Sequence, residues 1–438
     1  MKKHIAGFCA VLVLLVTLAM PVYATEGYEP TTAPTAEAAY VVNLDTNIVV
    51  YEKNSETSME AASLTKLMTM ILMLKSYQDQ LDTVTVTAPG YIYDILYGTG
   101  ASTADIWRGE THTLRTLLYC MELPSANEAA YIVADYIGGG SIDNFVAMMN
   151  TEAKAIGCTG TTFTDPCGLD PGNKTTARDA YLLLRTAMSY DAFVQAAAAP
   201  NFQVPASIKH DAPYNILTTN KMLTQGSSYF RGYAQGGKTG SLNQGWQNFA
   251  SWHTKDGISY LCVVLHSSDS IDNRPALVET AGLVDWAFDT FTIAPALDTT
   301  QPLTELPVQY STQTDTVMLY PADDMMTLLP RDTGAALTEL SYDLPETLSA
   351  PLQQGDVVGT VTLSIKGEKL GTVDLVAGST IERNNVLYTL SLIGDFFSGR
   401  YFKVVLTLTL LVVAAYAGLW FFFLVRATDS RQKKRRKS

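Results

Sequence analysis

Histidine and cysteine are scarce in this chain, with five of each among 438 residues. The histidines are scattered, and none pairs with an aspartate and a serine motif as a catalytic triad would need. No cysteine or histidine pair has the spacing of a metal-binding motif either. The sequence therefore predicts neither a metal site nor a cofactor. Cys158 and Cys167 are close enough to form a disulfide in an oxidising exterior, and a bridge and two free thiols both stay open.

Long uncharged apolar runs mark the two ends of the chain. The first follows Lys2 and Lys3, and Val22-Tyr23-Ala24 after it has the small-x-small form of a cleavage signal. This pattern predicts a secretory signal peptide over residues 1–24, in preference to a retained N-terminal anchor. The mature protein would then work outside the cytoplasm.

The second run covers residues 404–425. At about 1.5 Å per helical residue it can cross a hydrocarbon core of ~30 Å, so it predicts a transmembrane helix. The tail 426–438 is rich in lysine and arginine, and basic residues beside a span stay in the cytoplasm. We expect a single-pass protein of the cell membrane with the residues before the span outside. A net charge of −13 argues against nucleic acid as a partner.

The residues between the two apolar runs divide into segments of different composition and periodicity. Residues 25–37 predict a flexible lead-in, and residues 38–293 a domain with strands at both ends and helices between them. That pattern predicts an α+β fold with a mostly antiparallel sheet covered by helices. A linker rich in proline and threonine is expected at 294–302. Short alternating runs then predict a small all-β domain over 303–385.

The first candidate motif is Ser63-Leu64-Thr65-Lys66. Residues three apart on a helix share a face, so the Lys66 amine can reach the Ser63 hydroxyl. A serine hydroxyl needs a neighbouring base to act as a nucleophile, and a lysine serves only if its pKa falls from ~10.4. Burial and a second nearby cation both lower it. We expect Ser63 to be the nucleophile and Lys66 its base.

The second motif is Ser125-Ala126-Asn127, which follows a helix-breaking proline. The Ser125 hydroxyl can relay a proton to a leaving amine. The Asn127 amide can bind a substrate carbonyl and steady Lys66. Ser241-Leu242-Asn243 fits the same pattern, but it follows the third motif directly and cannot form a separate wall of the cleft. Ser125 is therefore preferred.

The third motif is Lys238-Thr239-Gly240, on a predicted strand after two further glycines. Lys238 and Thr239 offer a charge and a hydroxyl to a free substrate carboxylate. Glycine allows another backbone to come close, as when a peptide substrate lies alongside as an extra strand.

These strings, with Thr219-Asn220-Lys221 between the second and third, resemble the low-molecular-weight penicillin-binding proteins that act as D-alanyl-D-alanine carboxypeptidases. The resemblance implies a β-lactamase/transpeptidase-like catalytic fold. It also implies an oxyanion hole at the backbone N–H groups of Ser63 and Ser241, and an arginine, Arg274, near the substrate carboxylate. The family's usual amphipathic surface helix is expected to be replaced here by a true membrane span.

The resemblance implies removal of the terminal D-alanine from peptidoglycan stem peptides that end in D-Ala-D-Ala, through an acyl-enzyme that β-lactams also form. A β-lactamase is one alternative, but the Glu-x-x-Leu-Asn string of that class is missing. A non-catalytic muropeptide or β-lactam sensor is another. The sequence does not separate hydrolysis from transpeptidation, because both share the acyl-enzyme.

Overall fold

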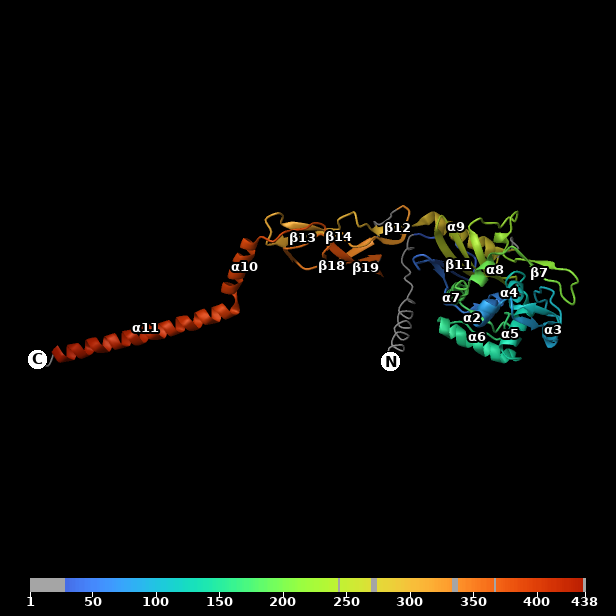
Figure 1. Cartoon of the computed structure of the whole chain (residues 1–438), viewed down its shortest axis with the longest axis horizontal. Coiled ribbons are helices and arrows are strands. Elements are labelled where there is room, and N and C mark those ends of the chain that lie inside the picture. Colours follow the sequence, from blue (N-terminus) through green and yellow to red (C-terminus); the bar gives the residue numbers. More distant parts are fainter. Residues whose placement is uncertain (1–27, 243–244, 269–273, 333–337, 366–367, 436–438) are drawn as a thin grey trace. The chain divides into compact units, whose positions relative to one another are not determined.

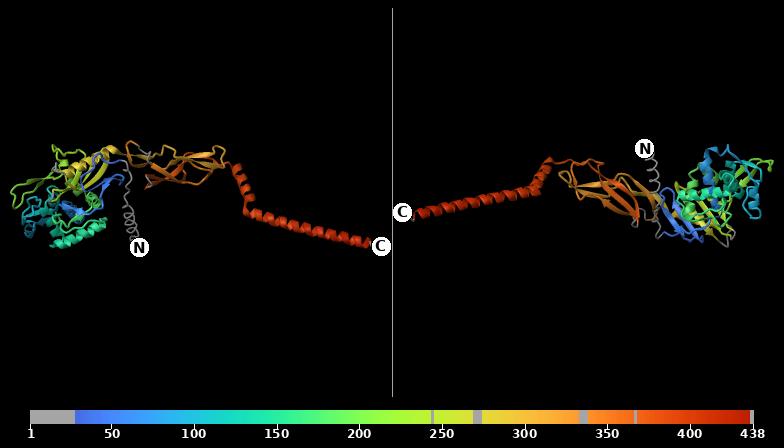
Figure 2. Two further views of the ribbon diagram at one scale, coloured as in Figure 1. Left: turned by 180° about the vertical axis from the view of Figure 1, so that it is seen from behind. Right: turned by 90° about the horizontal axis from the view of Figure 1, so that it is seen from below.

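The computed structural model describes residues 28–242, 245–268, 274–332, 338–365 and 368–435. The predicted signal peptide lies outside the described residues. The chain forms two compact units, one built mainly from the residues up to Ala296 and the other mainly from those after it. Each unit is described by itself below (Figures 1 and 2).

The first unit is organised by one antiparallel sheet. Its strands are β1 (Ala38–Asn43), β2 (Val49–Lys53), β9 (Ala234–Ser241), β10 (Gln247–Lys255) and β11 (Ile258–Ser267). They lie in the order β2-β1-β11-β10-β9, so the first strand of the unit pairs with its last large strand. This is the predicted antiparallel sheet with strands drawn from both ends of the domain. It leaves β9, which carries the third motif, at one edge.

Helices cover both faces of this sheet (Figure 1). Packed against the sheet are α7 (Ala177–Ala187), α8 (Asp191–Ala198) and α9 (Pro275–Thr290). The other helices of the unit are α2 (Lys66–Tyr77), α3 (Tyr91–Leu96), α4 (Leu114–Glu122), α5 (Asn127–Ile137) and α6 (Ile142–Ile156), with the 3-10 turns η1 (Ala62–Thr65), η2 (Gln78–Gln80) and η3 (Lys221–Leu223). The remaining strands are short and form the pairs β3 (Met59–Glu60) with β6 (Lys174–Thr175), β4 (Thr85–Thr87) with β5 (Thr111–Thr113), β7 (Asn201–Val204) with β8 (Tyr214–Leu217), and β12 (Phe291–Leu297) with β15 (Met325–Pro330).

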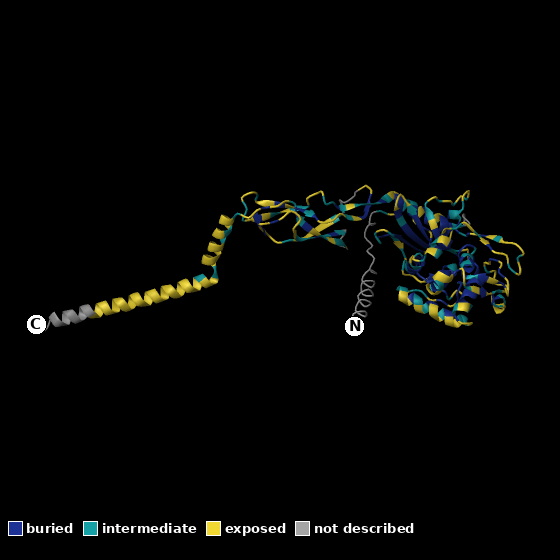
Figure 3. Cartoon of the chain, viewed as in Figure 1, coloured by how far each residue is buried: buried dark blue, intermediate teal, exposed yellow. Residues whose placement is uncertain are grey.

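Two hydrophobic cores form because side chains alternate along a strand. On β1, Tyr40 and Val42 pack with the helices that carry the first two motifs, whereas Ala39 and Val41 pack against α9. The central strands β1, β10 and β11 are buried along most of their length (Figure 3). A sheet held from both sides gives β9 a fixed position beside the turn that carries Ser63.

Two predicted boundaries differ from the structure. The expected flexible lead-in is fixed at its end, because the backbone N–H groups of Thr35 and Ala36 donate to Glu279 on α9 and Ala36 is fully buried. The expected linker 294–302 begins as strand, since β12 runs through Leu297 and pairs with β15. Proline and threonine do not prevent a strand where only one edge is paired.

The structure describes four cysteines, and all of them are buried and have free thiols: Cys120, Cys158, Cys167 and Cys262. The disulfide alternative for Cys158 and Cys167 is therefore wrong in this structure. Cys158 contacts the backbone of Asp179, and Cys167 belongs to a loop beside the first motif.

The second unit begins with an all-β domain, as its short alternating runs predict. Its sheet has the order β16-β18-β19-β14-β13-β17. The strands are β13 (Thr304–Gln309), β14 (Thr316–Pro321), β16 (Thr338–Asp343), β17 (Leu348–Ser349), β18 (Val357–Ile365) and β19 (Glu368–Ala377). Buried aliphatic residues such as Leu319, Leu363 and Leu375 fill its core.

Two helices end the chain. The first, α10 (Asn385–Ser398), is capped by the Asn384 side chain, which accepts from two backbone N–H groups of the first turn. The second, α11 (Arg400–Arg435), holds a mostly apolar stretch, Arg400–Arg426, that is long enough to cross a membrane. The structure therefore has a separate apolar helix before the candidate span, where the sequence led us to expect a span alone. Both helices expose large apolar side chains (Figure 3).

Candidate active site

The first motif brings a serine and a lysine into contact. Ser63 lies in the turn η1, and Lys66 begins α2 directly after it. The Lys66 Nζ atom lies 2.9 Å from Ser63 Oγ, and Ser63 is partly exposed while Lys66 is fully buried. Burial lowers the pKa of Lys66, because the charged form loses its hydration. This is the pairing that the motif spacing predicts.

A glycine-containing loop holds this pair from the other side. Lys66 Nζ also donates to the carbonyl oxygen of Cys167 at 2.9 Å. A Cβ atom on the next residue, Gly168, would lie 1.8 Å from the Ala62 carbonyl oxygen, so only glycine lets the loop come so close. The side chain of Asp165 shapes the loop by accepting from the backbone N–H groups of Cys167 and Gly168.

The second motif connects α4 to α5. Ser125 has a φ of 63°, a left-handed conformation that costs a non-glycine residue of order 1–3 kcal/mol. Its hydroxyl is buried and has no hydrogen-bond partner among the residues that the structure describes. Asn127 begins α5, and its backbone N–H donates to the Ser102 carbonyl at 2.8 Å. A strained residue with an unpaired buried hydroxyl is typical of a functional position.

The third motif lies on the edge strand β9. Lys238 is fully buried, and its pKa is lowered by burial and by the charge of Lys66. The hydroxyls of Thr239 and Thr219 are 2.6 Å apart, and Arg274 donates to the Thr219 carbonyl at 3.1 Å. Arg274 is partly buried at the start of α9, so it reaches the site through Thr219.

Two of the three glycines of β9 are required by contacts inside the sheet, a reason that the sequence analysis does not give. A Cβ on Gly236 would meet the Trp252 ring at 2.2 Å, and one on Gly237 would meet the Ala250 carbonyl at 2.5 Å. These two positions are therefore required by packing against β10. Gly240 differs, since its Cβ would lie 3.3 Å from that of Ala62. Gly240 thus brings the strand against the turn that holds Ser63, and Ser241 follows it at the end of β9.

One charged residue near these motifs is missed by the sequence analysis. Glu122 ends α4, is buried, and has a side-chain oxygen with no partner among the described residues. Burial raises its pKa, and the positive charges of Lys238 and Lys66 oppose that shift. Glu122 in turn opposes the fall in the pKa of Lys238. It stands in an apolar helical run without any motif, so only its burial reveals it.

A serine beside a buried amine, with a further lysine and serine close by, is the machinery of enzymes that form an acyl-serine. Comparison with known proteins gives the family. The chain belongs to the D-alanyl-D-alanine carboxypeptidases, whose family model matches residues 25–269, more than half of its length. A second model, the C-terminal domain of penicillin-binding protein 5, matches residues 288–383.

Individual relatives agree with this assignment. The D-alanyl-D-alanine carboxypeptidase DacF of Bacillus subtilis is 23% identical over 386 residues, which is 87% of this chain and 95% of the relative. The carboxypeptidase DacC of Escherichia coli is 28% identical over 359 residues, 80% and 86% of the two chains.

Solved structures share the fold. Penicillin-binding protein 5 of Haemophilus influenzae matches with a TM-score of 0.59 and 22% identity, covering 81% of this chain and all of that one. The protein PBP3 of Streptococcus pneumoniae matches with a TM-score of 0.59 and 25% identity over 80% of this chain. The predicted family, enzyme class and fold are confirmed.

Proposed function

We propose that this chain removes the terminal D-alanine from peptidoglycan stem peptides through an acyl-enzyme on Ser63. Its membership of the D-alanyl-D-alanine carboxypeptidase family supports the substrate class. The observation that carries the assignment of Ser63 is its contact with the buried Lys66 amine. A lysine with a lowered pKa has a neutral fraction that can take the hydroxyl proton.

Acylation breaks the last peptide bond. Ser63 Oγ attacks the carbonyl carbon of the penultimate residue while Lys66 Nζ accepts the hydroxyl proton. The contact of Gly240 with Ala62 supports an oxyanion hole made of the Ser63 and Ser241 backbone N–H groups. Such a donor is typically worth 10²–10³ in rate. The carbon–nitrogen bond then breaks, and the departing nitrogen receives a proton.

Ser125 is the proposed carrier of that proton. Its unpaired hydroxyl is free to donate its proton to the leaving nitrogen and then to be reprotonated by a lysine. Lys238, Thr239 and, through Thr219, Arg274 would hold the free carboxylate of the terminal D-alanine. Asn127 would bind the peptide upstream of the broken bond. Water then cleaves the ester, releases the shortened peptide and returns the proton to Ser63.

Two glutamates between the second and third motifs bear on the β-lactamase alternative. Glu128 accepts from the Thr103 hydroxyl and the Ala104 N–H, and Glu152 forms an ion pair with Lys75. Both carboxylates therefore have structural partners, which favours slow release of a β-lactam. We expect penicillin to acylate Ser63 and to remain bound.

We further propose that α11 crosses the cell membrane with the catalytic unit outside. The apolar stretch Arg400–Arg426 and the basic residues after it support this orientation. The helix α10 would lie on the outer membrane surface with its apolar side chains in the lipid.

The test is release of D-alanine from diacetyl-Lys-D-Ala-D-Ala by the full chain in detergent, beside Ser63→Ala. We expect release by the wild type and none by the variant. Rapid turnover of penicillin without release would instead identify a β-lactamase. A stable penicillin adduct without release would favour the sensor.

A further inference from the structure

A cavity adjoins the second motif, since its lining includes Glu128, the residue after Asn127. It has a volume of about 310 Å³, at the lower end of the range for small-molecule sites. Its lining includes Tyr93, Tyr97, Trp107, Arg108, Ser102 and Glu128. The proposed reaction uses none of these side chains.

The wall of the cavity is hydrogen-bonded to the backbone of Asn127. The Ser102 carbonyl, in its wall, accepts from the Asn127 backbone N–H at 2.8 Å, and Glu128 is the next residue of α5. An extended peptide of five residues spans at most roughly 17 Å. A group attached upstream of the peptide carbonyl that is proposed to bind Asn127 is therefore within reach of this cavity.

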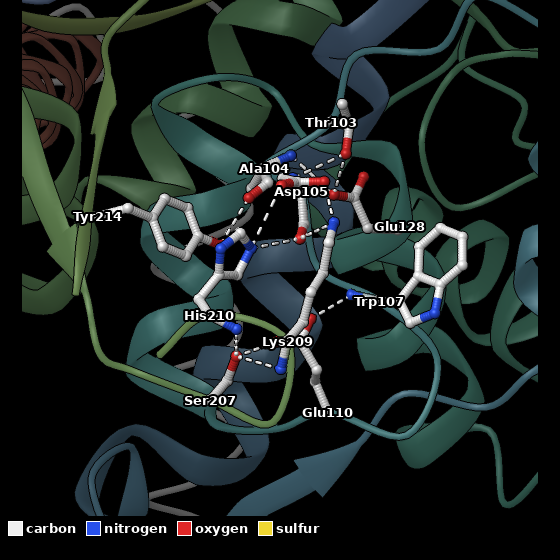
Figure 4. A network of polar contacts seen from close by, with 10 residues as sticks. All are labelled: Thr103, Ala104, Asp105, Trp107, Glu110, Glu128, Ser207, Lys209, His210 and Tyr214. Carbon is white, nitrogen blue, oxygen red and sulfur yellow. Dashed lines mark hydrogen bonds and ion pairs between the residues drawn. The ribbon is translucent and has the colours of Figure 1, made fainter. Parts of the chain in front are cut away.

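A polar network fixes the loop that forms the cavity wall (Figure 4). Asp105 of this loop forms ion pairs with Lys209 and His210 from the turn between β7 and β8. Glu110 accepts from the Ser207 hydroxyl and from the backbone N–H of Trp107. In Figure 4 the indole of Trp107 projects away from this network, so its backbone is held while its ring stays outside. The wall is thus built before any ligand binds.

The exposed surfaces of the cavity are aromatic rings with polar groups around them. Tyr97 is 88% exposed and Trp107 is 48% exposed, so both rings are accessible to a ligand. Ser102, an exposed residue of the lining, adds a hydroxyl beside the rings, whereas the Thr103 hydroxyl is already bonded to Glu128.

Charges of both signs lie around the cavity. Arg108 lies 5.5 Å from the Trp107 ring centre and 5.8 Å from that of Tyr93, and Lys209 lies 5.2 Å from that of Trp107, whereas the buried carboxylate of Glu128 is also part of the lining. A ligand with a single charge would therefore meet a like charge as well as an opposite one. A neutral ligand with both an apolar face and hydroxyl groups fits best.

We propose that this cavity binds a sugar ring of the peptidoglycan strand to which the stem peptide is attached. The proposal rests on the proposed function. A sugar ring has a carbon–hydrogen face that packs on indole and phenol rings, and its hydroxyl and acetamido groups bond to hydroxyls and backbone groups at the rim. The enzyme would then select peptides that are still attached to glycan over free peptides.

The experiment compares two substrates with the full chain in detergent. One is a free pentapeptide ending in D-Ala-D-Ala, and the other is the same pentapeptide on an N-acetylated disaccharide. In Trp107→Ala and Tyr97→Ala we expect the preference for the disaccharide substrate, measured as the ratio of kcat/KM values, to fall about tenfold. Tyr136→Ala, which removes an exposed aromatic ring elsewhere on α5, should leave the ratio unchanged.

Other outcomes separate the two proposals. Equal losses on both substrates, or no change in the ratio, would overturn the sugar site while leaving the carboxypeptidase intact. If the wild type cleaves neither substrate, binding of the peptide-free disaccharide is measured by calorimetry. Binding that Trp107→Ala abolishes would uphold the sugar site without the activity, and absence of binding would overturn it. Labelling by fluorescent penicillin shows that each variant is folded.

Discussion

At the scale of the residue, the proposed chemistry depends on lysine amines that are kept out of water. Lys66 and Lys238 are both fully buried, and burial lowers the pKa of each. A neutral amine is a base, whereas a protonated one holds a carboxylate. The two lysines are therefore proposed to have different roles. Lys66, when neutral, acts as the base, and Lys238, when protonated, binds the substrate carboxylate.

Lys66→Arg tests the base directly. Arginine keeps the positive charge but cannot lose its proton in a protein. We expect the rate of acylation by penicillin to fall at least 10³-fold. In the wild type that rate should rise with pH, because deprotonation of Lys66 creates the base, and the rise should be centred below the usual lysine pKa of ~10.4. Lys75→Arg is the matched control, since Lys75 pairs with Glu152 on the surface. Acylation of Lys66→Arg at the wild-type rate would contradict the role of Lys66.

Glu122→Gln tests the buried carboxylate. Removing its charge removes an interaction that raises the pKa of Lys238, so Lys238 loses its proton at a lower pH. A fall of one pKa unit corresponds to about tenfold in protonation. We expect the alkaline limb of the kcat/KM profile for peptide cleavage to move to lower pH, and KM at pH 7 to rise up to about tenfold. Glu152→Gln should show neither effect. A lower kcat with an unshifted profile would make Glu122 merely structural.

The sequence predicts contacts that short spacing enforces, such as that of Ser63 with Lys66. It does not predict Glu122, because one glutamate in an apolar helix has no distinguishing pattern until its burial is known. Nor does it give the reason for Gly236, whose neighbour Trp252 comes from the adjacent strand. Long-range packing decides both cases.

At the scale of the element, the site forms where the strand β9 contacts the turn η1. Gly240 brings β9 against Ala62, where a Cβ would lie 3.3 Å from that of Ala62 and 3.2 Å from that of Asn248. These distances are tight without being impossible. The strand would therefore move by a fraction of an ångström if a methyl group were added, with a larger effect on the geometry of the site than on folding.

Gly240→Ala should accordingly lower the acylation rate by about 10–10²-fold, because small displacements of an oxyanion donor are costly. The change in the free energy of unfolding should stay within about 2 kcal/mol. Gly232→Ala is the control, since a Cβ there meets nothing within 4 Å. Stopped-flow acylation and urea unfolding measure the two quantities. Normal acylation in Gly240→Ala would show that this contact does not position the site.

Elements with strong periodicity agree with prediction, and irregular ones do not. The helices on either side of Pro124 and the hairpin of β10 and β11 follow from their apolar patterns. The start of the linker is a strand because β15 pairs with it, and this partner lies far along the sequence. The residues before β1 are fixed by Glu279 for the same reason. Contacts between distant segments are not visible in local composition.

At the scale of the whole molecule, the chain combines a catalytic unit, a β unit and an apolar C-terminal region. We propose that the two apolar helices give two levels of membrane attachment, because a span is held far more firmly than a helix on the surface. The separation of α10 from α11 at Gly399 makes the two levels testable.

A chain that ends at Gly399 should lose integral attachment and keep peripheral attachment through α10. We expect alkaline carbonate to release it from membranes, whereas the full chain stays in the pellet. Replacing Phe396 and Phe397 of the shortened chain by serine should then free it from lipid vesicles. Retention of the shortened chain in carbonate-washed membranes would contradict α11 as the anchor. Release of the full chain would do so too.

The central claim is that Ser63 carries the acyl group during turnover. The most direct measurement is mass spectrometry of the full chain quenched in acid while it cleaves a D-Ala-D-Ala peptide, followed by digestion and peptide mapping. The account predicts one adduct, of the mass of the peptide minus its terminal D-alanine, on Ser63. An adduct on another residue such as Ser125, or D-alanine release without any adduct, would contradict it.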